Sequence, residues 1–332
     1  MEDANQSVKF VFWLKKESAM KNMTKLILSL FSGASLAVIT TSQAAVLFYE
    51  PFDAAGGTTL ANLGTPLGGS GSWSDNSSGT GSSGSGQAMT VRANGTTGAS
   101  SGQTWAGIPG TSAFPNTGGF LEGERRNDNS GSISLSSSVV SEFVDGSTIW
   151  LSFVAGATLV PGQPDNHHKP NVAIGQGALL DDRAQSAAGQ AVGGGVAHNT
   201  SGGNPRARWW DGDDFLGNSI SRISPQQLFI TKIEFGAASE TITTAVFDIE
   251  SFAGLSESDF NNATQSTITT PGNLDNATFD TLSFHGSRSN FDEIRLATTF
   301  DAAVGLGAVI PEPSSVFLSL IGLGFVAVRR RR

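Results

Sequence analysis

The residues best suited to chemistry lie together past the middle of the chain, where two adjacent indoles precede three carboxylates in the order Trp209, Trp210, Asp211, Gly212, Asp213 and Asp214. Calcium binds oxygen ligands at such turns, so Asp211, Asp213 and Asp214 are candidate calcium ligands. Phe215 breaks the spacing of an EF-hand loop, and a solvated acidic turn is the competing interpretation. The flat face of Trp209 or Trp210 would also suit the C–H face of a sugar ring. Because neighbouring strand residues point to opposite faces, one indole would face the core and only the other would be a glycan platform.

Other chemistry-bearing residues give weaker signals. His167 and His168 are adjacent in a polar segment, and adjacent residues rarely point at one ion, so a surface loop is favoured over a metal site. Gly193, Gly194 and Gly195 precede no helical pattern, which argues against a phosphate-binding loop. The chain contains no Cys, so disulfides, thiolate nucleophiles and Cys-ligated metals are excluded. No cofactor is expected apart from Ca²⁺ at the acidic turn.

The charge balance restricts the partners. The 332 residues carry a formal net charge of −9, and nine of the 20 Lys and Arg residues lie in the two ends of the chain. A nucleic-acid-binding protein needs a basic face to neutralise phosphate, so this class is excluded, and an anionic membrane surface is a poor partner for the acidic middle.

The segments that would position these residues are short and β-rich. Apolar or alternating runs broken by Gly, Pro, Asn or Asp predict strands at 46–49, 132–135, 148–154, 171–174, 228–235, 241–249, 278–284 and 291–297. The Gly- and Ser-rich stretch 57–102 is expected to be loop or weak edge strand. One helical turn is expected at 256–260 with Ser256 as its N-cap, and residues 301–310 are expected to be a linker. This pattern predicts an all-β, antiparallel β-sandwich over residues 45–300.

Alternation also assigns faces within two of these strands. Ile149, Leu151, Phe153, Phe229, Ile233 and Phe235 should share the buried interior, while Trp150, Ser152, Ile230, Lys232 and Glu234 should face the other way. Trp150 and Ile230 mean that this second face is not wholly polar, so either a loop covers it or a ligand uses it.

The order of four segments resembles the concanavalin A-like, laminin-G-type jelly roll: 48–53, 147–153, 229–236 and 291–296. The resemblance implies two curved sheets packed face to face, with the first and last strands paired. It also implies long loops at 57–102 and 175–203. Glucanases of this type carry Glu-x-Asp-x-x-Glu on one strand. The nearest acids here, Asp248 with Glu250 and Glu122 with Glu124, lack the third acid, so catalysis is not expected.

The N-terminal end has the features of a secretory signal peptide at residues 1–44. Lys21 and Lys25 precede an apolar run at 26–39, and small residues then lead to a cleavage site between Ala44 and Ala45. Residues 1–19 fit poorly in front of this pattern and are interpreted as an over-extended gene start. A core helix or a retained membrane anchor is the competing interpretation.

The C-terminal end, residues 309–332, has three parts. Pro311, Glu312 and Pro313 keep the chain extended, an apolar segment at 316–328 would enter the bilayer as a helix, and a basic cluster pins the end in the cytoplasm: Arg329, Arg330, Arg331 and Arg332. This order resembles the PEP-CTERM sorting signal of Gram-negative bacteria. The resemblance implies recognition by exosortase, a membrane-embedded transpeptidase-like enzyme that processes the tail near the Pro-Glu-Pro. An ordinary tail anchor is the alternative.

The two ends and the middle together favour an exported, non-catalytic protein with one lectin-like sandwich. Its partners during export would be the Sec translocon and exosortase. It would pass through the inner membrane and then reach the cell surface or an extracellular polysaccharide matrix. Two alternatives stay open: a carbohydrate-binding module with a defined glycan ligand, and a divergent glycoside hydrolase or lyase.

Overall fold

A computed structural model describes residues 46–75, 89–93, 119–122, 128–157, 169–177, 180, 186–197, 203–221, 226–249, 255–287 and 289–305. The chain divides into two compact units, residues 1–43 and 44–332, and every described residue belongs to the second. The expected signal peptide with its Ala44–Ala45 cleavage site, the sorting tail, His167 and His168 lie outside the described residues.

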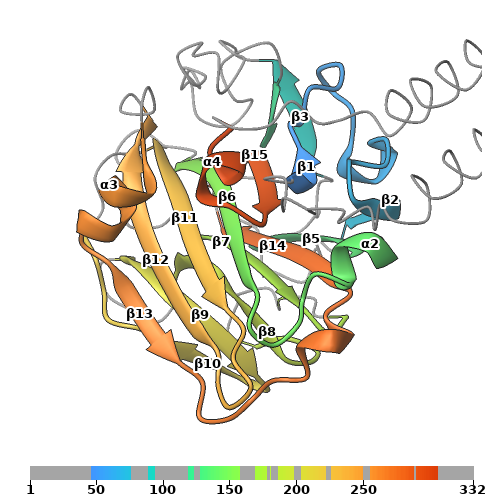
Figure 1. Cartoon of the computed structure of the whole chain (residues 1–332). Coiled ribbons are helices and arrows are strands. Elements are labelled where there is room, and N and C mark those ends of the chain that lie inside the picture. Colours follow the sequence, from blue (N-terminus) through green and yellow to red (C-terminus); the bar gives the residue numbers. More distant parts are fainter. Residues whose placement is uncertain are drawn as a thin grey trace, which may run out of the picture. The chain divides into compact units, whose positions relative to one another are not determined.

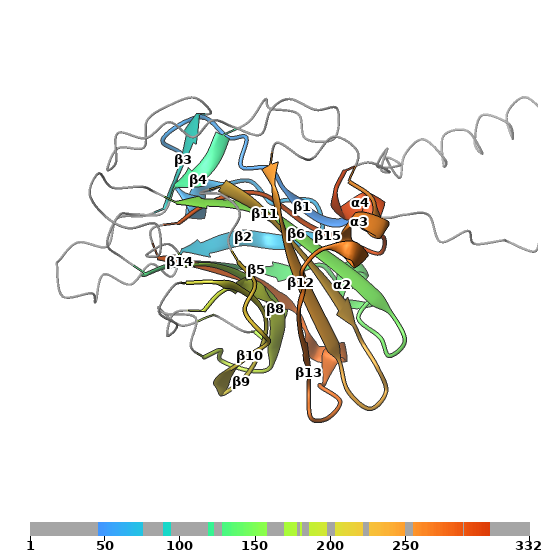
Figure 2. The ribbon, with the colours of Figure 1, turned by 90° about the vertical axis from the view of Figure 1, so that its left-hand side faces the viewer.

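Two antiparallel sheets form a jelly-roll β-sandwich (Figures 1 and 2). The eight-stranded sheet has the order β13 (Ser266–Thr269), β12 (Thr241–Asp248), β11 (Gln226–Glu234), β6 (Thr148–Ala157), β15 (Ser289–Ala297), β4 (Gly119–Glu122) and β3 (Thr90–Ala93), and β1 (Val46–Glu50) also pairs with β15. The seven-stranded sheet has the order β10 (Asp213–Leu216), β9 (Pro205–Asp211), β8 (Ala191–Val196), β7 (Lys169–Gly175), β14 (Thr281–Ser287), β5 (Asp128–Leu135) and β2 (Gly69–Asp75). The pairing of the first and last strands, which the resemblance implies, is confirmed by the register Tyr49↔Arg295.

The core lies between the sheets and has the predicted composition on β6 and β11. The register Phe153↔Phe229 and Ile149↔Ile233 brings the expected residues together, and the rings of Phe153 and Phe229 stack at 4.7 Å. All six expected interior side chains belong to the main hydrophobic core. The face assignment of these strands is therefore confirmed.

The outer face of the eight-stranded sheet carries a second, smaller core. Two short helices, α3 (Glu257–Asn262) and α4 (Phe300–Ala303), lie on it (Figure 2). Phe260 and Phe300 pack edge-on against Trp150 at 5.0 and 5.2 Å. Trp150 and Ile230 are thus covered by two short helices, and not by the loop or the ligand that the sequence left open.

The helices confirm one prediction and correct another. Ser256 caps α3 in a capping box with Asp259, as the sequence predicts. The linker expected from residue 301, however, begins later, because α4 includes Ala302 and Ala303 and both are fully buried. Three further short elements complete the described structure: η1 (Leu60–Asn62), α2 (Ser137–Val140) and η4 (Asn276–Thr278). No helix in the described ranges is both long and apolar enough to cross a bilayer.

The Gly-rich stretches behave in two ways. Within 57–102, β2 and β3 are the terminal strands of the two sheets, which confirms the expectation of weak edge strands there. Within 175–203, by contrast, β8 is an inner strand rather than part of a long loop. An added Cβ at Gly194 would lie 2.3 Å from Thr231 Oγ1, so the glycine permits the two sheets to approach at this point.

Candidate functional site

The predicted indole and acidic segment forms a tight hairpin between β9 and β10. Gly212 makes the turn with φ of +76°, and the cross-strand pairs are Asp211↔Asp213 and Trp209↔Phe215. The rings of Trp209 and Phe215 are parallel to within 9°, with centroids 4.0 Å apart. Trp209 is 5% exposed and Phe215 is 38% exposed. The hairpin therefore presents one half-open aromatic ring, Phe215, with the indole of Trp209 behind it.

The expectation that Trp209 or Trp210 is itself the platform needs correction. Trp209 belongs to the main core, as one of the pair was expected to do. Trp210 points to the opposite face, yet it is 0% exposed, because it packs with Ala173, Leu180 and Ala191 beneath the guanidinium of Arg208. Both faces of β9 are thus covered. The sequence signal that could have indicated Phe215 is its position opposite Trp209 across the Asp-Gly-Asp turn.

The three carboxylates of the hairpin do different things. Asp214 forms a two-pronged ion pair with the fully buried Arg208, whose Nε and Nη2 donate to its oxygens at 3.0 and 2.5 Å. Arg208 also donates to Asn171 and to the carbonyl of Val196. Asp211 and Asp213 are exposed on either side of Gly212. Because Asp214 is the counter-ion of a buried cation, it is not free to join the other two around calcium. Nowhere in the described part of the chain do three or more His, Asp or Glu side chains gather to hold a metal ion.

The outer face of the seven-stranded sheet carries a polar layer that the sequence did not indicate. Ser132, Ser283 and His285 lie on β5 and β14, in the register Ser283↔Ser132. All three are buried, and Ser283 Oγ has no hydrogen-bond partner. The layer is polar but covered, so it offers no open surface for a ligand.

A second group of ionisable residues lies at the corner where β1 meets β15. Glu50 accepts hydrogen bonds from the Phe52 amide and from Trp73 Nε1, both at 2.9 Å. Glu293 accepts from Tyr49 Oη at 3.2 Å and from Arg295 Nη2 at 2.7 Å. Burial raises the pKa of Glu50 and of Glu293, although their hydrogen bonds and Arg295 oppose the shift. Burial, with repulsion from Glu293, holds the pKa of Asp292 well above its usual range.

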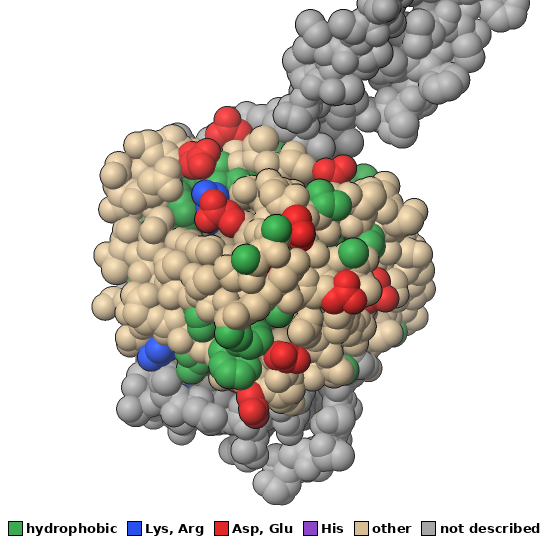
Figure 3. Space-filling view, turned by 60° about the horizontal axis from the view of Figure 1, so that its bottom comes forward, with side chains coloured by type: hydrophobic (Ala, Val, Ile, Leu, Met, Phe, Trp, Pro, Cys, Tyr) green, Lys and Arg blue, Asp and Glu red, His purple; other side chains and the backbone are tan. Residues whose placement is uncertain are grey.

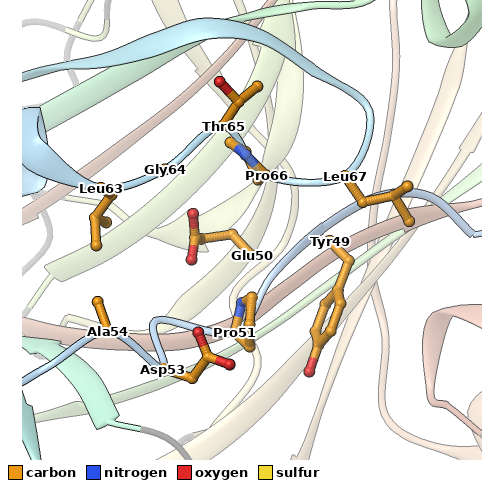
Figure 4. A pocket seen from close by; sticks show the side chains of 10 residues that line it. All are labelled: Tyr49, Glu50, Pro51, Asp53, Ala54, Leu63, Gly64, Thr65, Pro66 and Leu67. Carbon is orange, nitrogen blue, oxygen red and sulfur yellow. The ribbon is translucent and has the colours of Figure 1, made fainter.

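A pocket of about 270 Å³ opens beside this corner, between the end of β1 and the segment that leads to β2. Figure 4 shows the Glu50 carboxylate pointing into it, with Tyr49 turned away. Its walls combine the apolar side chains of Leu63, Pro66 and Leu67 with the polar side chains of Asp53 and Thr65. Since both Glu50 oxygens already accept hydrogen bonds, this carboxylate serves the fold rather than an open catalytic site.

The acids considered for glycoside hydrolysis do not assemble. Glu122 is buried in an ion pair with Arg92 at 2.6 Å, and Asp248 ends β12 opposite Gln227. Their sequence neighbours Glu124 and Glu250 lie outside the described residues. In the eight-stranded sheet β12 and β4 are separated by three strands, so Asp248 and Glu122 do not face each other at the spacing that retaining or inverting hydrolysis requires.

Comparison with known proteins identifies the C-terminal end. A family model described as the PEP-CTERM protein-sorting motif matches residues 309–332. The chain carries a PEP-CTERM sorting motif. The motif implies an exported protein that exosortase processes. No curated protein sequence matches the chain.

Solved structures similar to the chain include three proteins at 11–12% sequence identity. The endo-1,3-beta-glucanase from Streptomyces sioyaensis is 11% identical over 79% of this chain and 98% of its own, with a TM-score of 0.40. Domain 4 of AbnA, a GH43 extracellular arabinanase from Geobacillus stearothermophilus, is 12% identical over 80% and 100%, with a TM-score of 0.41. Lectin I from Ulex europaeus, in complex with the methyl glycoside of alpha-L-fucose, is 11% identical over 55% and 87%, with a TM-score of 0.30.

Proposed function

We propose that this PEP-CTERM protein is a non-catalytic component of the cell envelope or extracellular matrix, delivered there by its two end signals. The observation that carries the proposal is the sorting motif at residues 309–332, preceded by a folded β-sandwich. The Sec translocon would export the chain, the apolar tail segment would hold it in the inner membrane, and exosortase would process the tail. Acidic side chains are spread over the face of the molecule shown in Figure 3, which suits a domain displayed outside the cell.

The non-catalytic part of the proposal rests on the buried acids, which already have partners within the fold. Glu50, Glu122 and Asp214 each have a hydrogen-bond or ion-pair partner within the fold. We expect the purified protein to release no reducing sugar from β-1,3-glucan or arabinan. Release that disappears when Asp248 is changed to Asn would instead establish a hydrolase.

The sorting proposal is tested by removing the motif. The full chain and a chain ending at residue 308 would be expressed in a Gram-negative host that contains exosortase. We expect the full chain to reach the cell surface or the matrix and the truncated chain to remain in the periplasm. The same final location for both would show that the tail does not direct the protein.

Glycan binding is a second candidate, favoured by the half-open Phe215 ring. A pyranose could stack on this ring while Asp211 and Asp213 accept hydrogen bonds from its hydroxyls. A glycan array probed with and without EDTA would identify a ligand and any need for calcium. Phe215→Ala should abolish binding, whereas Val144→Ala, at another exposed apolar side chain, should not. Equal binding by wild type and Phe215→Ala would exclude the hairpin as the binding site.

A further inference from the structure

The corner where the first strand meets the last has an unusual backbone. Phe52 and Glu293 are the two non-glycine residues with positive φ among the described residues, at 49° and 53°. The register of β15 against β6 also shifts between Asp292 and Arg295. L-residues adopt this conformation at a cost, so the surrounding contacts must hold it in place.

The bulge in β15 brings an excess of acid into the interior. Glu50, Asp292, Glu293 and Arg295 are each between 4% and 6% exposed. The single guanidinium of Arg295 pairs with Glu293 at 2.7 Å and lies 4.6 Å above the Tyr49 ring. Among the described residues of this corner, three buried carboxylates thus accompany one buried cation, and the exposed Asp53 adds a further negative charge beside them.

The hydrogen bonds of Glu50 and Asp292 bring no positive charge that would balance these two carboxylates. Glu50 accepts from an amide and an indole, and Asp292 accepts from the amide of Glu293 at 2.9 Å. These donors are neutral. If all three acids were ionised, the corner would hold a net negative charge out of water, which is strongly unfavourable. The raised pKa of each carboxyl agrees with this accounting.

We propose that Glu50, Asp292 and Glu293 form a proton-dependent latch that ties β1 to β15. With a proton retained at the corner, the acids stay buried around Arg295 and the two strands remain paired. When that proton is lost, repulsion among the three acids and Asp53 loosens the junction. Tyr49 also faces the cluster, and because burial raises its pKa it stays neutral and does not change the balance.

The latch joins the first strand of the domain to its last strand, and each of these strands lies near one end of the domain. β1 starts at Val46, directly after the expected signal cleavage, and β15 is followed within a few residues by α4 and then by the segment leading to the tail. Opening the corner would free the N-terminal strand and leave an unpaired strand edge beside the eight-stranded sheet. In an exported protein with this latch, the pairing of β1 with β15 is most stable in mildly acidic surroundings.

The direction of the pH dependence follows from the raised pKa values. The contribution of the latch is complete below the ordinary pKa of a carboxyl group and is lost as the pH rises through the raised values. The midpoint of thermal unfolding of the purified protein should therefore fall between pH 5 and pH 8. A fall of roughly 3–8 °C is expected.

Two variants and a control separate the latch from general effects of pH. Glu50→Gln and Asp292→Asn remove a titrating group with little change in shape, so each should flatten the slope of the melting midpoint against pH. Glu142→Gln, at an exposed acid on α2, should leave the slope unchanged. The criterion is the slope of the melting midpoint against pH. Loss of one hydrogen-bond acceptor alone would lower the melting midpoint by the same amount at every pH and would leave this slope unchanged. Slopes equal to that of the wild type in both variants would overturn the latch.

A further measurement on the wild type needs no variant. Hydrogen exchange, corrected for intrinsic rates, should show β1 amides losing protection between pH 5 and pH 8 relative to those of β11. Equal protection changes in the two strands would contradict the proposal. Calcium is the other control: if added Ca²⁺ removed the pH dependence and Glu50→Gln abolished that effect, a bound cation rather than a proton would be the partner of these acids.

Discussion

At the scale of single residues, the stacked pair Phe153 and Phe229 tests the assignment of the inner face. Phe153 is fully buried between Phe229 and Phe291. Phe153→Ala should lower the free energy of unfolding by about 3–5 kcal/mol, because it removes buried apolar surface and leaves a cavity.

Lys232→Ala is the matched change on the outer face of the neighbouring strand. Lys232 pairs with Glu234 at a partly exposed position, so this change should cost about 1 kcal/mol or less. Urea unfolding of both variants makes the comparison, and a larger loss for Lys232→Ala would contradict the register.

Residue-level prediction succeeded where local alternation decides the outcome and failed where remote parts of the chain decide it. The faces of β6 and β11 follow from the two-residue repeat of a strand. The burial of Trp210 does not follow, because its cover comes from Ala173 and Leu180, which lie about 30 or more residues away in the sequence. The acidic corner was missed for the same reason, since Glu50 and Asp292 are separated by almost the whole domain.

At the scale of elements, β8 tests how closely the sheets approach. Gly194 faces the hydrogen-bonded pair of Thr231 and Thr244 on the opposite sheet, and an added Cβ would lie 2.3 and 2.7 Å from their hydroxyl oxygens. Gly194→Ala should therefore lower the free energy of unfolding by about 1–3 kcal/mol through overpacking. Gly64→Ala is the control, since nothing lies within 4 Å of its added Cβ. Urea unfolding should show no loss for the control, and equal effects of the two changes would mean that the sheets do not meet at Gly194.

Elements with strong side-chain signals were predictable, and those set by packing were not. Apolar alternation indicates β6, β11, β12 and β15, and the serine cap indicates α3. The glycines of β8 carry no strand propensity, so this strand exists because the sandwich leaves room for a bare backbone. α4 is too short for a periodic signal and is held by Phe300 against Trp150.

At the scale of the whole molecule, the start of the mature chain is the first question. β1 begins at Val46, so cleavage between Ala44 and Ala45 would leave the strand that pairs with β15 intact. We expect Ala45 as the N-terminal residue of the exported protein, by Edman sequencing or mass spectrometry. A mature chain that still contained residues 26–39 would show that this segment is a retained anchor rather than a signal peptide.

The other end of the chain sets where the domain is held. The described domain ends at Gly305, six residues before Pro311, so the sorting motif follows the folded sandwich closely in the sequence. Glu312→Ala should give an unprocessed, membrane-retained form with a normally folded sandwich, because only exosortase recognition is lost.

Removing Arg329 to Arg332 should act differently: without the positive charges nothing holds the tail on the cytoplasmic side, and the apolar segment can slip outward. Cell fractionation with an epitope tag placed before Val309 distinguishes the two. If wild type and both variants showed the same distribution, the tail would be an ordinary anchor and the sorting interpretation would be wrong.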